Sequence, residues 1–104
     1  MSIQFRPLNK VHQFMNEIGY EPGYAYDDLV FSNDAVFIIQ FADEKVDSLK
    51  LFINQDCIET EADRIKTQYR ARAAAEKFSV EYKGTYTLDQ QEGTEEIQIN
   101  FSNN

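Results

Sequence analysis

Residues 48–77, SLKLFINQDCIETEADRIKTQYRARAAAEK, change from a strand pattern to a helix pattern within a few positions, and this change decides the fold class. The apolar run Ser48–Asn54 predicts a strand. From Asp56 to Lys77 the apolar residues recur at helical spacing, which predicts a long helix; they are Ile58, Ala62, Ile65, Tyr69 and Ala73. Acidic residues near its start and basic residues near its end suit the helix dipole. The chain therefore joins a strand to a long helix without a linker.

The sequence before this stretch predicts one short helix and two more strands. Apolar residues share one helical face over 8–18, where Pro7 suits the entry and Gly19 the exit. The connector Tyr20–Tyr26 contains Pro22 and Gly23 and is predicted to be a turn. The apolar runs Asp28–Ser32 and Ala35–Ala42 then predict two strands joined by a tight turn.

The sequence after the long helix predicts two half-buried strands, because apolar and polar residues alternate over 78–88 and over 97–101. Gly84 falls at an inward position of the first, which predicts a bulge or a close approach. The order α-β-β-β-α-β-β predicts an α+β fold: a single layer of about five mostly antiparallel strands with two helices on one face. All of it is expected to form a single domain over residues 1–104. In element order alone the chain resembles the small acidic secretion chaperones, a likeness of shape that carries no function.

Alternation along the strands assigns the apolar side chains to the two faces of the sheet. The face under the helices is predicted to carry Leu29, Phe31, Phe37, Ile39, Phe41, Leu49, Leu51 and Ile53. The opposite face is predicted to carry Val30, Val36, Ile38 and Phe52, which is more than a solvent-facing surface usually shows. Three explanations stay open: the first helix covers this face, a second copy or partner covers it, or the assignment is one residue out of register.

Composition excludes several classes of protein. The 104 residues carry a net charge of −8, which disfavours binding to a nucleic-acid backbone. No apolar run reaches the roughly 20 residues that cross a bilayer, so no membrane association is expected. No signal-peptide pattern begins the chain, and a cytoplasmic protein is therefore expected. Cys57 is the one cysteine, which excludes an internal disulfide and a cysteine-based zinc site.

Residues that could carry catalysis are few and scattered. His12 has no carboxylate or nucleophile near it in the sequence, and it is read as a surface or boundary residue. Cys57 near a helix start could have a lowered pKa, although a buried or tolerated thiol is the simpler interpretation. The acidic residues lack calcium-loop spacing, and no glycine-rich phosphate loop or hydrolase motif is present. The sequence thus predicts no enzyme, no metal and no cofactor.

Charge is distributed unevenly along the chain. Residues 21–63 carry eleven acidic side chains against Lys45 and Lys50, whereas residues 64–83 carry six basic side chains against Glu76 and Glu81. The basic residues are interpreted first as a solvated helix face that pairs with neighbouring acids. A second interpretation is a contact for an anion or an acidic partner, with Arg64, Arg70 and Arg72 as the candidates.

Six tyrosines are many for a chain of this size, and tyrosine suits surfaces that are apolar at one end and wet at the other. Tyr20, Tyr24 and Tyr26 in the connector are therefore candidates for partner binding, together with Val30, Val36, Ile38 and Phe52 of the unexplained sheet face.

The leading functional hypothesis is a small acidic protein-binding module, of the adaptor, inhibitor, immunity or chaperone-like kind, acting as a dimer. Its partner would be another protein or a second copy, bound through a sheet face or an edge strand. The alternative is a small-ligand-binding domain with a pocket between the long helix and the sheet, lined by Tyr69, Tyr82 or Arg72.

Overall fold

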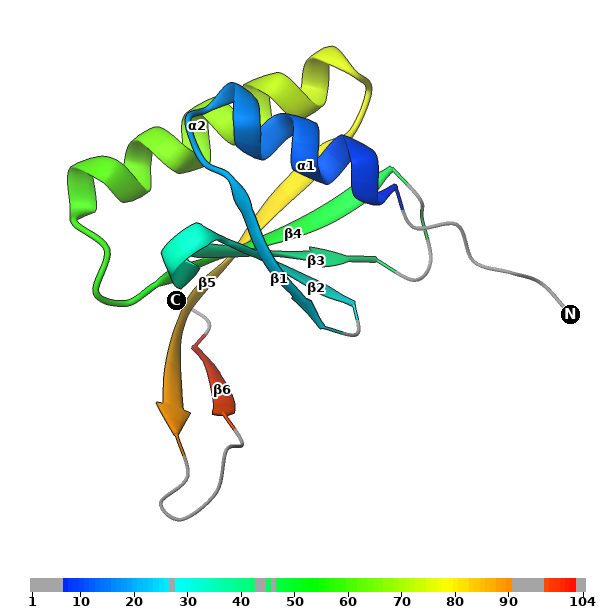
Figure 1. The fold of residues 1–104 in the computed structure, drawn as a ribbon. Helices are drawn as coiled ribbons and strands as arrows, with labels where there is room; N and C mark the ends of the chain where they lie inside the picture. Colours follow the sequence, from blue (N-terminus) through cyan, green and yellow to red (C-terminus); the bar gives the residue numbers. More distant parts are fainter. Residues whose placement is uncertain (1–6, 27, 43–44, 46, 91–96, 103–104) are drawn as a thin grey trace, which may run out of the picture.

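The computed structural model describes residues 7–26, 28–42, 45, 47–90 and 97–102 (Figure 1). The elements follow in the order α1 (Leu8–Glu17), β1 (Pro22–Tyr26), β2 (Leu29–Ser32), the 3₁₀ turn η1 (Asn33–Ala35), β3 (Phe37–Phe41), β4 (Ser48–Asn54), α2 (Glu59–Ala75), β5 (Ser79–Gln90) and β6 (Ile97–Ser102). The described strands form one six-stranded sheet in the order β1-β2-β3-β4-β5-β6. Among the described strands only the β4–β5 pair is parallel, since α2 carries the chain back across the sheet between them. The predicted α+β fold with a mostly antiparallel sheet is confirmed.

The additional strand is β1, in the connector that was predicted to be a turn. Its residues pair antiparallel with β2, with an irregularity between Pro22 and Ala25. Proline is tolerated at the first residue of an edge strand, because its missing N–H is not needed there. At Gly23 a Cβ atom would lie 2.8 Å from the Ser32 carbonyl oxygen, so glycine permits this close pairing. With β1 included, the element order no longer matches that of the secretion chaperones.

Both helices cover the same face of the sheet (Figure 1). Each contributes a stripe of buried residues at helical spacing: Val11, Phe14 and Met15 from α1, and Ile65, Tyr69 and Ala73 from α2. The Tyr69 ring lies edge-on to Phe14 of α1 and to Phe37 of β3, with centroid separations of 5.7 and 5.8 Å. This ring therefore joins both helices and the sheet in one core.

A second apolar cluster lies on the opposite face and is covered by the chain's own C-terminal strands. It contains Leu29, Phe31, Ile38, Phe52 and Tyr86. At the predicted bulge, Leu51 pairs with Tyr82 and Phe52 with Gly84, so that β5 carries one extra residue there. Beyond this bulge, β5 and β6 leave the plane of the other strands on the side away from the helices (Figure 1). Phe101 of β6 then contacts Phe52, with ring centroids 4.4 Å apart.

The predicted faces of β2 were wrong by one residue. Val30 pairs with Ile39 and lies under the helices, whereas Leu29 and Phe31 lie on the second face with Ile38. All four residues of β2 are buried, the polar Ser32 included, so the strand has no exposed residue to show which side faces water. The turn before β3 is longer than a two-residue hairpin, because the 3₁₀ turn Asn33–Ala35 and Val36 separate β2 from β3; within it Asp34 and Ala35 adopt positive φ angles of 60° and 52°. The explanation that the first helix covers the second face was wrong too, since α1 lies beside α2.

Candidate functional site

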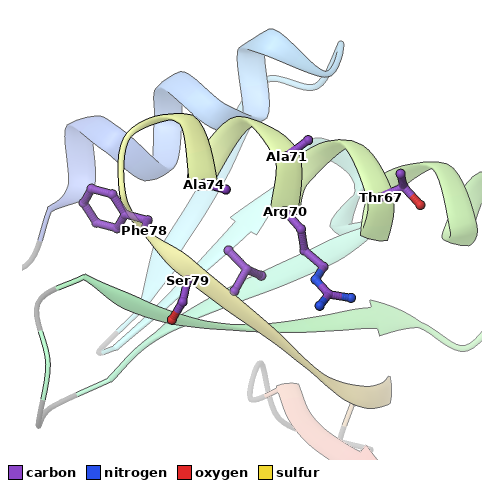
Figure 2. A pocket seen from close by; sticks show the side chains of 7 residues that line it. Thr67, Arg70, Ala71, Ala74, Phe78 and Ser79 are labelled. Atoms are coloured by element: carbon purple, nitrogen blue, oxygen red, sulfur yellow. The ribbon is translucent and has the colours of Figure 1, made fainter.

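A groove runs between α2 and the first half of β5 (Figure 2). Its volume is about 540 Å³, and it is lined by Thr67, Arg70, Ala71, Ala74, Phe78, Ser79 and Val80. Figure 2 shows the Arg70 side chain reaching from α2 toward β5 and the Phe78 ring near the other end. The groove thus places one cation beside a mostly apolar surface.

The groove follows from how α2 packs on the sheet. The helix buries Ile65, Tyr69 and Ala73, which turns the neighbouring stripe of Thr67, Arg70, Ala71 and Ala74 toward β5. Alanine side chains end at Cβ, so they leave a space that longer residues would fill. Val80 is almost completely buried and forms part of the apolar lining.

The same half of β5 has an unpaired edge. Ser79 donates its N–H to the Asp47 carbonyl oxygen at 2.8 Å, on the side of β4. Because backbone groups alternate along a strand, the N–H and C=O groups of Val80 and Tyr82 point to the opposite side. β6 pairs with β5 only from Thr85 onward, and none of the described strands pairs with that side of Ser79–Tyr82. An open strand edge therefore borders the groove.

Of the described residues that line the groove, only Arg70 is charged. Arg70 makes no ion pair or hydrogen bond with any residue that the structure describes. Lys66 lies nearby with its Nζ atom 4.5 Å from the Tyr82 ring centroid, a cation–π contact, and 3.4 Å from an Asp63 carboxylate oxygen. Arg70 is thus the cation that remains available to a ligand in the groove.

Arg64, the first of the predicted anion-binding residues, already forms hydrogen bonds with groups of the chain itself. Its guanidinium donates to both Glu61 carboxylate oxygens, at 2.8 and 2.6 Å, and to the Ile18 carbonyl oxygen at 3.0 Å. Tyr20 donates its hydroxyl hydrogen to the same carboxylate at 2.5 Å. Hydrogen bonds from Arg64 and Tyr20 lower the pKa of Glu61 to about 2, and burial together with that hydrogen bond raises the pKa of Tyr20 to about 12. This cluster ties α1 to α2 and leaves Arg64 without a free donor pair for a ligand.

The other two predicted arginines differ from Arg64. Arg72 is exposed and has no partner among the described residues, but it does not line the groove. Of the three arginines, only Arg70 faces the groove, so the structure does not bring the predicted anion-binding residues together.

The connector tyrosines also separate. Tyr20 is half-buried against Phe37, with ring centroids 5.2 Å apart, whereas Tyr24 is 66% exposed and lies beside Phe31. Tyr26 belongs to β1, and its side chain lies outside what the structure describes. Tyr24 is therefore the connector tyrosine that the structure places at the surface.

The predicted apolar patch of Val30, Val36, Ile38 and Phe52 does not exist as one surface. Val30 and the half-buried Val36 belong to the helix side of the sheet, whereas Ile38 and Phe52 belong to the second face. Ile38 is 0% exposed and Phe52 is 6% exposed. These residues fill the chain's two cores, so in this conformation they offer no contact surface to a partner.

The alternative pocket residues are not at the groove either. Tyr69 is buried and donates its hydroxyl hydrogen to the Val11 carbonyl oxygen at 3.3 Å, and neither Tyr82 nor Arg72 lines the groove. A hollow between the long helix and the sheet was predicted, but its alanine and phenylalanine lining was missed. The available signal was the pair Ala71 and Ala74, which share a helix flank with Arg70.

The remaining candidates for chemistry lie apart from the groove. Burial and the nearby Glu61 charge raise the pKa of the Cys57 thiol, which opposes the activation considered from its place near the helix start. His12 is half-buried on α1. Within the described residues, no three His, Cys, Asp or Glu side chains gather as a metal site would require, and no helix has the length and apolar character to span a membrane.

Comparisons with protein-family models, with curated proteins and with solved structures found no match to this chain.

Proposed function

We propose that the chain is a small acidic protein-binding module without enzymatic activity, which accepts an extended segment of a partner as an added strand along Ser79–Tyr82. The single observation that carries this proposal is the open edge of β5 beside the groove. In strand addition, backbone hydrogen bonds hold the incoming segment and neighbouring side-chain pockets select it. Here the outward N–H and C=O groups of Val80 and Tyr82 would form the backbone hydrogen bonds, and the groove would be the side-chain pocket.

A small-molecule ligand is the second candidate, because the volume of about 540 Å³ lies in the range of such sites, about 300–1,000 Å³. A small-molecule site usually buries most of its ligand, about 70–90% of the surface. Here Thr67, Arg70, Ala71, Ala74 and Ser79 are all exposed, so the groove is open along its length. This openness favours an extended segment that continues beyond the groove at both ends.

The partner can be another protein or a second copy of the chain. Two β5 edges can pair antiparallel about a two-fold axis, which would give the dimer expected from the sequence. Light scattering over a range of concentrations distinguishes the two cases, since only self-association raises the mass of the isolated chain.

The test is a selection of peptides from a random display library on the immobilised chain, followed by measurement of the affinity of synthetic copies. Ala74→Arg fills the groove, whereas Ala75→Arg places the same side chain on an exposed position outside it. We expect Ala74→Arg to weaken binding at least tenfold and Ala75→Arg to change it less than twofold. If the chain is monomeric by light scattering and selects no peptide, or if both variants bind equally, the proposal is refuted.

A further inference from the structure

We propose that the segment bound at β5 carries an acidic side chain that pairs with Arg70 and, two residues along, an apolar side chain over Ala71 and Ala74. This inference rests on the proposed function and names the chemistry of its partner.

The spacing of the groove matches the spacing of alternate side chains in a strand. Lys66 in the middle of α2 lies over Tyr82, whereas Ala74 near the end of α2 lines the groove with Val80, which precedes Tyr82 in β5. The helix and the strand therefore run side by side in opposite directions. Arg70 and Ala74 are one turn apart, about 6 Å along the helix axis. Side chains two residues apart on one face of a strand are separated by about 7 Å. One added strand can therefore present one side chain to Arg70 and the next inward one to Ala74.

Charge selects an acidic residue for the first position. The Arg70 guanidinium has no partner among the described residues, although the chain as a whole carries a charge of −8. Arginine pairs with a carboxylate through two parallel N–H···O bonds, a geometry that lysine cannot offer. Lys66 is already paired with Asp63, so the selection rests on Arg70, which would repel a basic residue in the segment.

The shape of the groove selects an apolar residue for the second position. Ala71, Ala74, Phe78 and Val80 surround this part of the groove with carbon atoms, and the two alanines leave room for a side chain the size of valine or leucine. Phe78 is half-buried, so an apolar side chain placed there would remove part of its ring from water.

Two probe peptides test the inference, Thr-Thr-Val-Thr-Glu-Thr-Thr and its reverse, Thr-Thr-Glu-Thr-Val-Thr-Thr, each labelled with fluorescein and measured by anisotropy. The two orders cover the two possible strand directions. We expect one of them to bind at least fivefold more tightly than the same peptide with Gln in place of Glu, and this advantage to shrink at high salt.

Two arginine variants separate pairing from general charge. Arg70→Gln should abolish the preference for Glu over Gln, while Arg72→Gln, with the same change of charge two residues away, should preserve it. Both residues are exposed on α2, and circular dichroism checks that each variant is folded.

Other outcomes overturn the inference in distinct ways. If Glu and Gln peptides bind equally, yet both lose affinity to Ala74→Arg, the acidic preference is refuted and the proposed function survives. If only library-selected peptides bind, we expect their sequences to carry Asp or Glu two positions from an apolar residue. Selected sequences without this pattern would refute the inference. If the chain is a dimer that Ala74→Arg converts to a monomer, a second copy occupies the edge, and the inference of an acidic segment is refuted because Ser79–Tyr82 has no acidic residue two positions from an apolar one. If the chain is monomeric and no peptide from either source binds, the inference and the proposed function both fail.

Discussion

Truncation of Phe101 tests whether the C-terminal strands cover the second apolar cluster. Phe101 is 44% exposed, so somewhat more than half of its surface is removed from water, and its ring contacts Phe52. A phenylalanine buries about 150–250 Å² when fully enclosed, which gives roughly 100 Å² here. At about 25 cal/mol per Å², and allowing for a compact unfolded state, Phe101→Ala should lower the free energy of unfolding by about 2 kcal/mol.

Urea unfolding followed by circular dichroism measures this loss, and Ser102→Ala is the matched control on the same strand. Ser102 is exposed, so its truncation should change the stability by less than about 0.5 kcal/mol. A double-mutant cycle with Phe52→Ala should give a coupling of about 0.5–1.5 kcal/mol, as expected for two rings in contact. If Phe101→Ala costs no more than Ser102→Ala and the coupling is absent, β6 does not cover Phe52, and the second face would need another cover.

Three further predictions concern single positions. The pKa of Glu61 is lowered from 4.5 to about 2, so its pairing with Arg64 stabilises the fold above pH 4.5, and this stabilisation is lost as the pH falls toward 2. Because both side chains are about one-third exposed, the loss should be about 1 kcal/mol, and Glu61→Gln should remove this pH dependence from acid-unfolding curves. Gly23→Ala should lower the free energy of unfolding by about 1–3 kcal/mol in urea titrations, because the new Cβ meets a backbone oxygen at 2.8 Å. Gly19→Ala should cost only about 1 kcal/mol, since Gly19 has open space around it and only the backbone strain at φ +95° is added. The raised pKa and partial burial of Cys57 should make its alkylation by iodoacetamide several-fold slower than that of N-acetylcysteine at pH 8, and an equal or faster rate would contradict the environment described here.

The elements that could be predicted from the sequence are those with an unambiguous period. The helix spacing of Ile65, Tyr69 and Ala73 gave α2 to within three residues at each end, and Gly84 marked the bulge in β5. β1 was missed because Pro22 and Gly23 normally indicate a turn, and only the pairing with β2 shows that an edge strand tolerates both.

The candidate site was less predictable because it depends on contacts between distant parts of the chain. Charge marked Arg70 as a candidate together with Arg64 and Arg72. Nothing in the local sequence shows that Arg64 pairs with Glu61 or that Arg72 does not line the groove. The second face illustrates the same difficulty. Its apolar residues suggested an external cover, while Phe101, nearly fifty residues from Phe52 in sequence, provides one from within the chain.

The open edge of β5 is short, and this limits what it can do without side-chain contacts. Val80 and Tyr82 together offer two N–H donors and two C=O acceptors to an added strand, and each hydrogen bond contributes a net of about 0.5–1.5 kcal/mol. The total of roughly 2–6 kcal/mol reaches only the lower end of the cost of association, about 4–15 kcal/mol. Backbone pairing alone should therefore not hold a partner or drive aggregation, and the bulge at Gly84 ends the regular edge after a few residues. Any stable complex at this edge must gain the remaining free energy from Arg70 and from the apolar lining of the groove, so its affinity should depend more on the partner's sequence than on its ability to form a strand.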